Sequence, residues 1–456
     1  MKRLLPLLFL FFPVTLWAQN SIEGRIHNLD TKTIYLLSFY GEKSTTIDSI
    51  IADPAGRFLF TIAPGKKPGM YRVQWGKDNL VDLIWNRENI SFETNSLTPS
   101  DSLVIINSVE NRIYYDYSKK DRNTQSRLEL LMPVVDYYPV HDSYYYLTAA
   151  EMERIQKEQA RLLDSLDQAH PGSYSARIFR LYQTPFLASG LKKEERLKVL
   201  QQHYFDKVNF NDTSLLHSPA FANKAISYLA LYSDNRLDKK HLEAEFIRAV
   251  TIMLSAASVN PDVFKFLLDY LVSGFDKYHF DEVITYIADN FQDPFSCEDQ
   301  KRKSNLQKKL ETFKKIAVGK VAPAIELPDQ KGKMVTLAGI QTEYTLLVFW
   351  STECPHCTDF MPRLKALYDS QKPKRFEVLA VSVDTSRTAW TDFIRKEKLN
   401  WPNVSDLQGF AGKAADDYNI YATPTMFLLD KEKVILSKPI SFRETEQALR
   451  DQKLLP

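Results

Sequence analysis

Two cysteines three residues apart, Cys354 and Cys357, are the side chains of this sequence best suited to chemistry. They stand in the run Cys354-Pro355-His356-Cys357, directly after an apolar stretch with the pattern of a buried strand. A pair of this spacing at a strand-to-helix junction predicts a dithiol that opens and closes a disulfide. The first cysteine is expected at the helix N-terminus, where free N–H groups stabilise a thiolate. The second, one turn further, can then resolve a mixed disulfide formed by the first.

The residues around the two cysteines are expected to tune their reactivity. Pro355 restricts the loop and offers no competing N–H, and His356 can bring positive charge or a hydrogen bond to the Cys354 sulfur. The charge or hydrogen bond from His356 favours the thiolate, and a stabilised thiolate makes the disulfide more oxidising. Glu353 is either a further tuner of the site or a solvated neighbour, and Trp350 ends the apolar stretch ahead of the loop.

The elements that carry the motif alternate between strands and helices. Strands are predicted at residues 344–349, 376–383, 425–429 and 434–436, and helices over residues 356–370, 388–398 and 444–449. This alternation predicts an α/β sheet with flanking helices for residues 316–456.

The chain ahead of that region divides into two further parts, so a multidomain protein is expected. Residues 19–97 alternate between β-rich stretches and turns, which predicts a small β-sandwich or barrel. Residues 98–315 carry apolar residues at helical spacing, which predicts an all-α middle region. Within it, Thr148 and Glu151 have the spacing of a capping box. The tyrosines of residues 137–146 are expected mainly to pack between helices or fill irregular contacts, with a recognition surface as the alternative.

Residues 1–18 have the pattern of a secretory signal peptide. Lys2 and Arg3 form a basic start, an apolar run follows, and Ala18 suits cleavage. The apolar run is shorter than the roughly 20 residues that a membrane span needs. We expect export to the periplasm or cell envelope, with no membrane span in the mature protein.

The composition is that of an ordinary globular protein, with 44% hydrophobic and 25% charged residues. There are 59 Lys and Arg against 57 Asp and Glu, and loss of Lys2 and Arg3 with the signal peptide leaves 57 of each. A neutral chain gives no electrostatic reason to bind nucleic acid or an anionic membrane. Three cysteines are too few for a disulfide scaffold, so we expect the closely spaced pair to serve chemistry.

Four motifs around the cysteine pair resemble the thioredoxin superfamily, and most of all its exported TlpA/ResA-type thiol–disulfide oxidoreductases. These motifs are Gly319-Lys320-Val321-Ala322-Pro323, Phe349-Trp350, Pro362 and Tyr421-Ala422-Thr423-Pro424-Thr425. The resemblance covers residues 316–456 and implies a thioredoxin-like fold there. The preceding two thirds are similar to extensions that often precede such domains in exported bacterial proteins.

The resemblance implies a role for each residue of the site. Cys354 is the nucleophile and Cys357 the resolving cysteine, while His356 and the helix N-terminus set the thiolate pKa. Pro424 is cis and holds the substrate backbone beside the sulfur, and Thr423 contacts substrate through its own backbone. Protein thiols and disulfides are the implied substrates, and a thiol partner in the membrane or periplasm exchanges the electrons. No metal or organic cofactor is implied.

Several positions depart from the family pattern. Val348 stands where many thioredoxins carry a buried Asp, and Phe360 stands at one of the places where ResA-like proteins carry a Glu. Glu353 is then the one stand-in for the proton acceptor of Cys357. The Pro-His dipeptide is that of DsbA-like oxidants, whose potential lies about 150 mV above that of thioredoxin. The direction of electron flow therefore stays open, with cytochrome c maturation as one use for a reductant.

Other functions fit parts of the same pattern. In a thioredoxin-fold peroxidase of the AhpC/TSA type, Ser351 and Cys354 would form the Thr/Ser-x-x-Cys motif, but Leu347 stands where that motif needs a proline. A zinc site lacks ligands beyond the pair, and a structural disulfide in so small a loop stabilises little. The N-terminal two thirds could instead be an envelope binding module with an accessory redox domain. Cys297 is expected to be a free thiol without a catalytic role.

Overall fold

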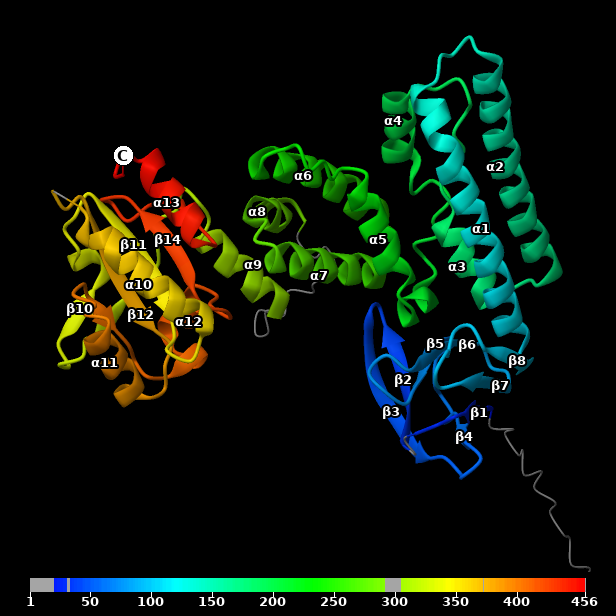
Figure 1. The fold of residues 1–456 in the computed structure, drawn as a ribbon, viewed down its shortest axis with the longest axis horizontal. Helices are drawn as coiled ribbons and strands as arrows, with labels where there is room; N and C mark the ends of the chain where they lie inside the picture. The colour runs from blue at the N-terminus through cyan, green and yellow to red at the C-terminus, as the bar shows by residue number, and fades with distance from the viewer. Residues whose placement is uncertain (1–19, 31–32, 292–304, 372, 456) are drawn as a thin grey trace, which may run out of the picture. The chain divides into compact units, whose positions relative to one another are not determined.

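The computed structural model describes residues 20–30, 33–291, 305–371 and 373–455 (Figure 1). The predicted signal peptide and Cys297 lie outside these residues. Two compact units are distinguished, Met1–Tyr270 and Leu271–Pro456. The division falls inside helix α7 (Pro261–Lys277), so the last turns of that helix belong to the second unit.

The first unit opens with strands that form, over its described residues, two sheets ordered β4-β1-β7-β8 and β3-β2-β5-β6. The strands are β1 Ser21–His27, β2 Thr33–Tyr40, β3 Lys43–Ile51, β4 Arg57–Thr61, β5 Gly69–Gln74, β6 Leu80–Trp85, β7 Ile90–Asn95 and β8 Val104–Asn107. Alternate residues of β1, β4 and β7 are buried, as in sheets with one covered face. Phe60 of β4 and Leu83 of β6 belong to the same apolar core, so the two sheets face each other across it.

Helices follow these sheets. They are α1 Val109–Tyr137, α2 Ser143–Ala169, α3 Tyr174–Tyr182, α4 Lys193–His203, η1 Thr213–His217, α5 Ala220–Ala230 and α6 Lys239–Ala257. Asn111 ties α1 to β6, because its side-chain amide accepts the Ile84 N–H and donates to the Ile84 carbonyl, each at 2.8 Å. Among the described residues, no helix is both long and apolar enough to cross a membrane.

The start of α2 differs from the predicted capping box. The helix begins at Ser143, because the Asp142 carboxylate accepts the Tyr144 N–H at 2.7 Å and caps it earlier. Thr148 therefore lies inside the helix and donates to the Tyr144 carbonyl, while Glu151 pairs with Arg154. The prediction failed because a second capping residue stood upstream.

The expected packing of the tyrosine cluster is also mostly wrong. Tyr145 is buried, whereas Tyr137 and Tyr146 are 77% and 59% exposed. Both lie close to the turn that joins α1 and α2, where few neighbouring residues are available to cover them.

The second unit contains a sheet of order β13-β12-β11-β14-β15, in which β11, β12 and β13 are parallel and β14 and β15 antiparallel to their neighbours. The strands of this unit are β9 Glu326–Pro328, β10 Met334–Thr336, β11 Tyr344–Trp350, β12 Phe376–Ser382, β13 Asn403–Val404, β14 Thr425–Leu429 and β15 Ile435–Ser437. Its helices besides the end of α7 are α8 Asp281–Asn290, α9 Asn305–Lys315, η2 Leu337–Gly339, α10 Pro355–Asp369, α11 Arg387–Lys396, η3 Gly409–Ala411, α12 Lys413–Asp417 and α13 Phe442–Asp451.

The sheet of the second unit is covered on both faces. Alternate residues of β11 enter different cores: Val348 lies in one with residues of α10, α11 and α13, and Leu347 lies in the other with residues of α12. Helix α10 crosses the sheet in front of β11 and β12 (Figure 1). This is the thioredoxin-like fold that the sequence predicted, and burial on both faces explains why β11 is a continuous apolar run.

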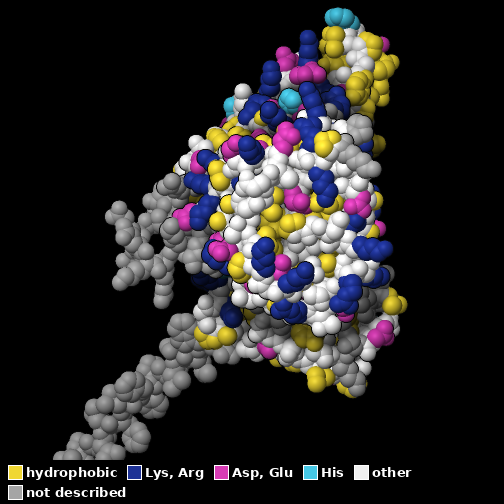
Figure 2. Space-filling view, turned by 90° about the vertical axis from the view of Figure 1, so that its left-hand side faces the viewer, with side chains coloured by type: hydrophobic (Ala, Val, Ile, Leu, Met, Phe, Trp, Pro, Cys, Tyr) yellow, Lys and Arg dark blue, Asp and Glu magenta, His cyan; other side chains and the backbone are white. Residues whose placement is uncertain are grey.

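The charge on the surface agrees with the near balance of acidic and basic residues. On the face drawn in Figure 2, Lys and Arg side chains are interspersed with Asp and Glu. That face has no broad patch of a single sign to steer a strongly charged partner.

Candidate dithiol site

The junction of β11 and α10 positions the two cysteines. Cys354 is the N-cap of α10, and its carbonyl oxygen accepts the N–H groups of Cys357 at 3.0 Å and Thr358 at 3.1 Å. Pro355 occupies the first helical position, where a missing N–H costs no hydrogen bond. The helix N-terminus therefore lies beside the first sulfur, as the sequence predicted.

The two thiols differ in exposure and in pKa. Both are free, Cys354 is partly exposed, and Cys357 is 0% exposed. Burial raises the pKa of Cys354, but hydrogen bonds with Thr423, the Cys357 thiol and the backbone N–H groups of Cys357 and His356 outweigh it and bring the pKa below its ordinary value. Burial raises the pKa of Cys357 to about 12. The partly exposed thiol is therefore the one that ionises at the lower pH.

A second loop faces the pair from β14. Thr425 of β14 pairs with Phe349 of β11, so the residues just before β14 reach the same end of the sheet as the dithiol. The peptide bond Thr423–Pro424 is cis, and the Cys354 thiol donates to the Thr423 carbonyl at 3.1 Å. Thr423 and Pro424 thus lie next to the sulfur, where the sequence motif suggested they would be.

The loop between β11 and α10 is held by a buried carboxylate that sequence reasoning missed. Asp384, 3% exposed, accepts hydrogen bonds from the Ser351 hydroxyl at 2.7 Å and from the Thr352 N–H and hydroxyl, both at 2.9 Å. Its other oxygen accepts the Ser382 hydroxyl at 2.8 Å. Asp384 follows β12, the parallel neighbour of β11, so an acidic residue directly after a buried strand was the available signal.

The remaining predicted site residues lie at different depths. Trp350 is fully buried in the core beneath the dithiol, with its ring 5.2 Å from that of Phe393. Pro355, His356 and Glu353 are exposed. Among the described residues, neither the His356 ring nor the Glu353 carboxylate has a hydrogen-bond partner, so the contribution of His356 to the Cys354 thiolate comes from its backbone N–H. Pro362 lies inside α10, as the motif implied.

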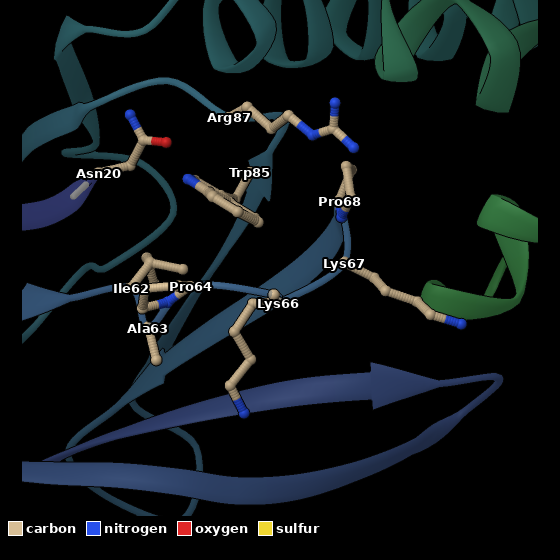
Figure 3. Close-up of a pocket in the computed structure, with 10 residues that line it drawn as sticks. Asn20, Ile62, Ala63, Pro64, Lys66, Lys67, Pro68, Trp85 and Arg87 are labelled. Atoms are coloured by element: carbon tan, nitrogen blue, oxygen red, sulfur yellow. The ribbon is translucent and has the colours of Figure 1, made fainter. Parts of the chain in front are cut away.

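A cavity of about 510 Å³ lies elsewhere, in the β-rich part of the first unit (Figure 3). Trp85 stands at its centre between Asn20 and Arg87, and Ile62 and Pro64 line another side. None of its lining residues belongs to the dithiol motif. It is therefore a feature separate from the redox site.

Family patterns match two segments of the chain. The AhpC/TSA family matches residues 318–438, which include the dithiol and the cis peptide bond Thr423–Pro424. A domain of unknown function (DUF4369) matches residues 21–114, which include the two sheets of the first unit.

Two solved structures illustrate the likeness at different coverage. A thiol-disulfide oxidoreductase from Bacteroides fragilis is 31% identical, covers 29% of this chain and 99% of its own, and has a TM-score of 0.27. A thioredoxin-like protein from Bacteroides caccae is 24% identical, covers 59% of this chain and 98% of its own, and has a TM-score of 0.43.

A curated relative establishes the family. The thiol-disulfide oxidoreductase ResA of Bacillus cereus is 31% identical over 133 residues, which are 29% of this chain and 75% of that protein. The structure adds a free dithiol at the N-terminus of α10 in a thioredoxin-like fold. The chain therefore belongs to the ResA-like thiol–disulfide oxidoreductases of the thioredoxin superfamily and is a protein-disulfide oxidoreductase.

Proposed function

We propose that the chain exchanges disulfides with protein substrates outside the cytoplasm, with Cys354 and Cys357 as its redox pair. The asymmetry of the two thiols carries this proposal. Cys354 is accessible and has a lowered pKa, whereas Cys357 is buried and has a raised one. The thiolate is the attacking species in disulfide exchange, so Cys354 meets the client and Cys357 acts second.

In the reducing direction, the Cys354 thiolate attacks one sulfur of a client disulfide. A bond forms between Cys354 and the client, and the other client sulfur leaves with the electron pair. Cys357 then loses its proton and attacks the Cys354 sulfur, which closes the Cys354–Cys357 disulfide and releases the second client sulfur as a thiolate. The client has gained two electrons and takes up one proton from Cys357 and one from solvent. Oxidation of a client dithiol is the reverse sequence.

The proton of Cys357 needs an acceptor, because its pKa is about 12. Val348 replaces the carboxylate that many thioredoxins carry, and the Glu353 side chain is exposed. Asp384 already accepts hydrogen bonds at both oxygens. We therefore assign proton uptake to the client thiolate that the first step releases beside the site.

The residues around the pair have supporting roles in this proposal. Pro424 and the Thr423 backbone bind the client chain, as their position against the Cys354 sulfur favours. Pro355, His356 and Glu353 tune the thiolate, and Trp350 supports the loop from below. A thiol partner in the membrane or periplasm restores the pair after each turnover.

The rest of the layout follows from the sequence. Residues 1–18 are a signal peptide that exports the chain to the periplasm or cell envelope. Residues 19–97 are a β-sandwich domain, residues 98–315 a helical domain and residues 316–456 the thioredoxin-like domain. We do not propose the peroxidase alternative, because the curated relatives are thiol–disulfide oxidoreductases and Leu347 stands in place of the motif proline.

Insulin reduction and thiol oxidation assays test the proposal. Cys354→Ala should abolish both activities of the full chain, and Tyr344→Phe, which removes a hydroxyl at the opposite end of β11, should leave them unchanged. Retained activity in Cys354→Ala would remove the proposal. The reduction potential of the pair then decides the direction, since a value near that of thioredoxin means a reductant and one near that of DsbA an oxidant.

A further inference from the structure

The loop beside the dithiol is tied to a helix that lies outside residues 316–456. The Tyr421 hydroxyl donates to the Asp276 carboxylate at 2.8 Å and reaches the Asp276 backbone carbonyl at 3.3 Å. Asp276, 7% exposed, lies in the last turn of α7. Tyr421 is two residues before Thr423, whose carbonyl accepts the Cys354 thiol.

A second contact joins the same two regions. The Lys438 amine, just after β15, pairs with the Asp281 carboxylate at the start of α8 at 2.8 Å, and both side chains are largely buried. Ion pairs shielded from water are screened less by salt than exposed ones. The turn from Asp276 to Asp281 is thus fixed at both of its ends to the thioredoxin-like fold.

We propose that the turn between α7 and α8, residues 276–281, is a brace that holds the cis-proline loop, residues 421–424, in place. In this proposal Tyr421 is a positioning residue that sets how a client polypeptide is presented to Cys354. The inference rests on the proposed function and gives part of the helical region a role in it. Tyr421 is two residues before Thr423, so its hydrogen bond with Asp276 limits the movement of the Thr423 and Pro424 backbone. These are the backbone atoms that would contact the client. A reaction that depends on the positioning of bound groups slows steeply when those groups are displaced by about 1 Å.

The brace should affect polypeptide disulfides and small disulfides differently. A polypeptide must lie along Thr423 and Pro424 to bring its sulfur to Cys354, so it depends on the loop position. A small disulfide reaches the partly exposed sulfur without that contact. Loss of the Tyr421 bond should therefore slow exchange with peptides and spare exchange with small disulfides.

The test uses the full chain with Cys357→Ser, so that only the attack by Cys354 is measured. Second-order rate constants are compared for a blocked peptide disulfide and for the aromatic disulfide DTNB. We expect Tyr421→Phe and Asp276→Ala each to lower the peptide rate about five- to tenfold, the effect of one hydrogen bond, with the DTNB rate within about twofold of the parent. The double variant should match the single ones, because both changes break the same contact.

Controls separate a brace from general damage. Tyr344→Phe removes a hydroxyl that has no hydrogen-bond partner among the described residues, at the far end of β11, and should change neither rate. Lys438→Met should lower the peptide rate selectively even if the Asp276 variant folds poorly, which thermal unfolding would reveal. Equal slowing of both reactions, or no slowing of the peptide reaction, overturns the brace. A parent chain that does not react with the peptide at all overturns the proposed function, and the brace with it.

Discussion

The hydroxyl of Ser351 donates to the carboxylate of Asp384 at 2.7 Å, across the carboxyl ends of two adjacent parallel strands. Ser351 begins the loop that carries the dithiol, and Asp384 follows the neighbouring strand β12. Thr352 donates two further hydrogen bonds to the same oxygen. Asp384 therefore anchors the start of the loop that leads to Cys354.

Removal of the Asp384 charge should therefore loosen the dithiol loop. In Asp384→Asn one oxygen becomes an amide N–H₂, which cannot accept the bonds that the carboxylate accepts. We expect a loss of about 1.5–3 kcal/mol in the free energy of unfolding, the usual range for hydrogen bonds to a charged group. Urea denaturation measures this loss. Ser382→Ala removes one of these bonds and should cost about 1 kcal/mol; equal stability of Asp384→Asn and the parent would contradict the role of Asp384.

The two cysteines should react with alkylating agents over separate pH ranges. The pKa of Cys354 is lowered, so its thiolate fraction rises through a pH below the ordinary value for cysteine. The pKa of Cys357 is raised to about 12, so its thiol stays protonated and buried through neutral pH. Iodoacetamide at pH 7 should label Cys354 and spare Cys357 in the reduced native chain, as peptide mass mapping can establish. Preferential labelling of Cys357 would reverse the assignment of the two roles.

The same shifts have opposite effects on the pH dependence of stability. A lowered pKa in the folded state contributes stability above the unfolded pKa, and this contribution is lost as pH falls through the folded value. A raised pKa, as at Cys357, costs stability as pH rises above the unfolded value toward about 12. In reducing buffer, Cys357→Ala should therefore weaken the fall in stability between about pH 9 and 11. Urea midpoints measured across that range check this, and an unchanged slope would contradict the burial-raised pKa.

The exposed neighbours of the pair should have small effects. The Glu353 carboxylate and the His356 ring are exposed, and an exposed charge interaction is worth up to about 1 kcal/mol. That energy corresponds to about 20 mV for a two-electron couple. Glu353→Gln and His356→Ala should each shift the reduction potential of the pair by no more than this, measured against a glutathione buffer. A shift several times larger would show that one of these side chains approaches the sulfur in solution.

The sequence predicted the local parts of the site well and the long-range parts poorly. The place of Cys354 at a helix N-terminus follows from an apolar run, a proline and a pair spacing, all within a few residues. Asp384 and Asp276 are distant in sequence from the residues that they contact near the dithiol. The place of Asp384 after a buried strand is a weak signal, and nothing in the neighbouring sequence marks Asp276. The predicted boundary at residue 316 came from the alternation of strands and helices, whereas the contact of Tyr421 with Asp276 depends on how the chain folds back.

Predictions from short sequence patterns also failed where two patterns competed. Thr148 and Glu151 had the spacing of a helix cap, but Asp142 caps the helix upstream. The pattern predicts that the tyrosines near the α1–α2 turn pack between helices, yet most of them are exposed, because burial depends on what surrounds the turn. Choosing between such alternatives requires knowledge of the neighbours that the fold supplies.

Trapping of a client on the full chain with Cys357→Ser tests the central claim most directly. Without its resolving partner, Cys354 should hold a client protein in a mixed disulfide that reducing agent releases. Mass mapping of the adduct should find the client bound to the Cys354 peptide, and Cys354→Ala should abolish the adduct. If no adduct forms with oxidised client proteins, or if the adduct maps to Cys297, disulfide exchange through this pair is contradicted.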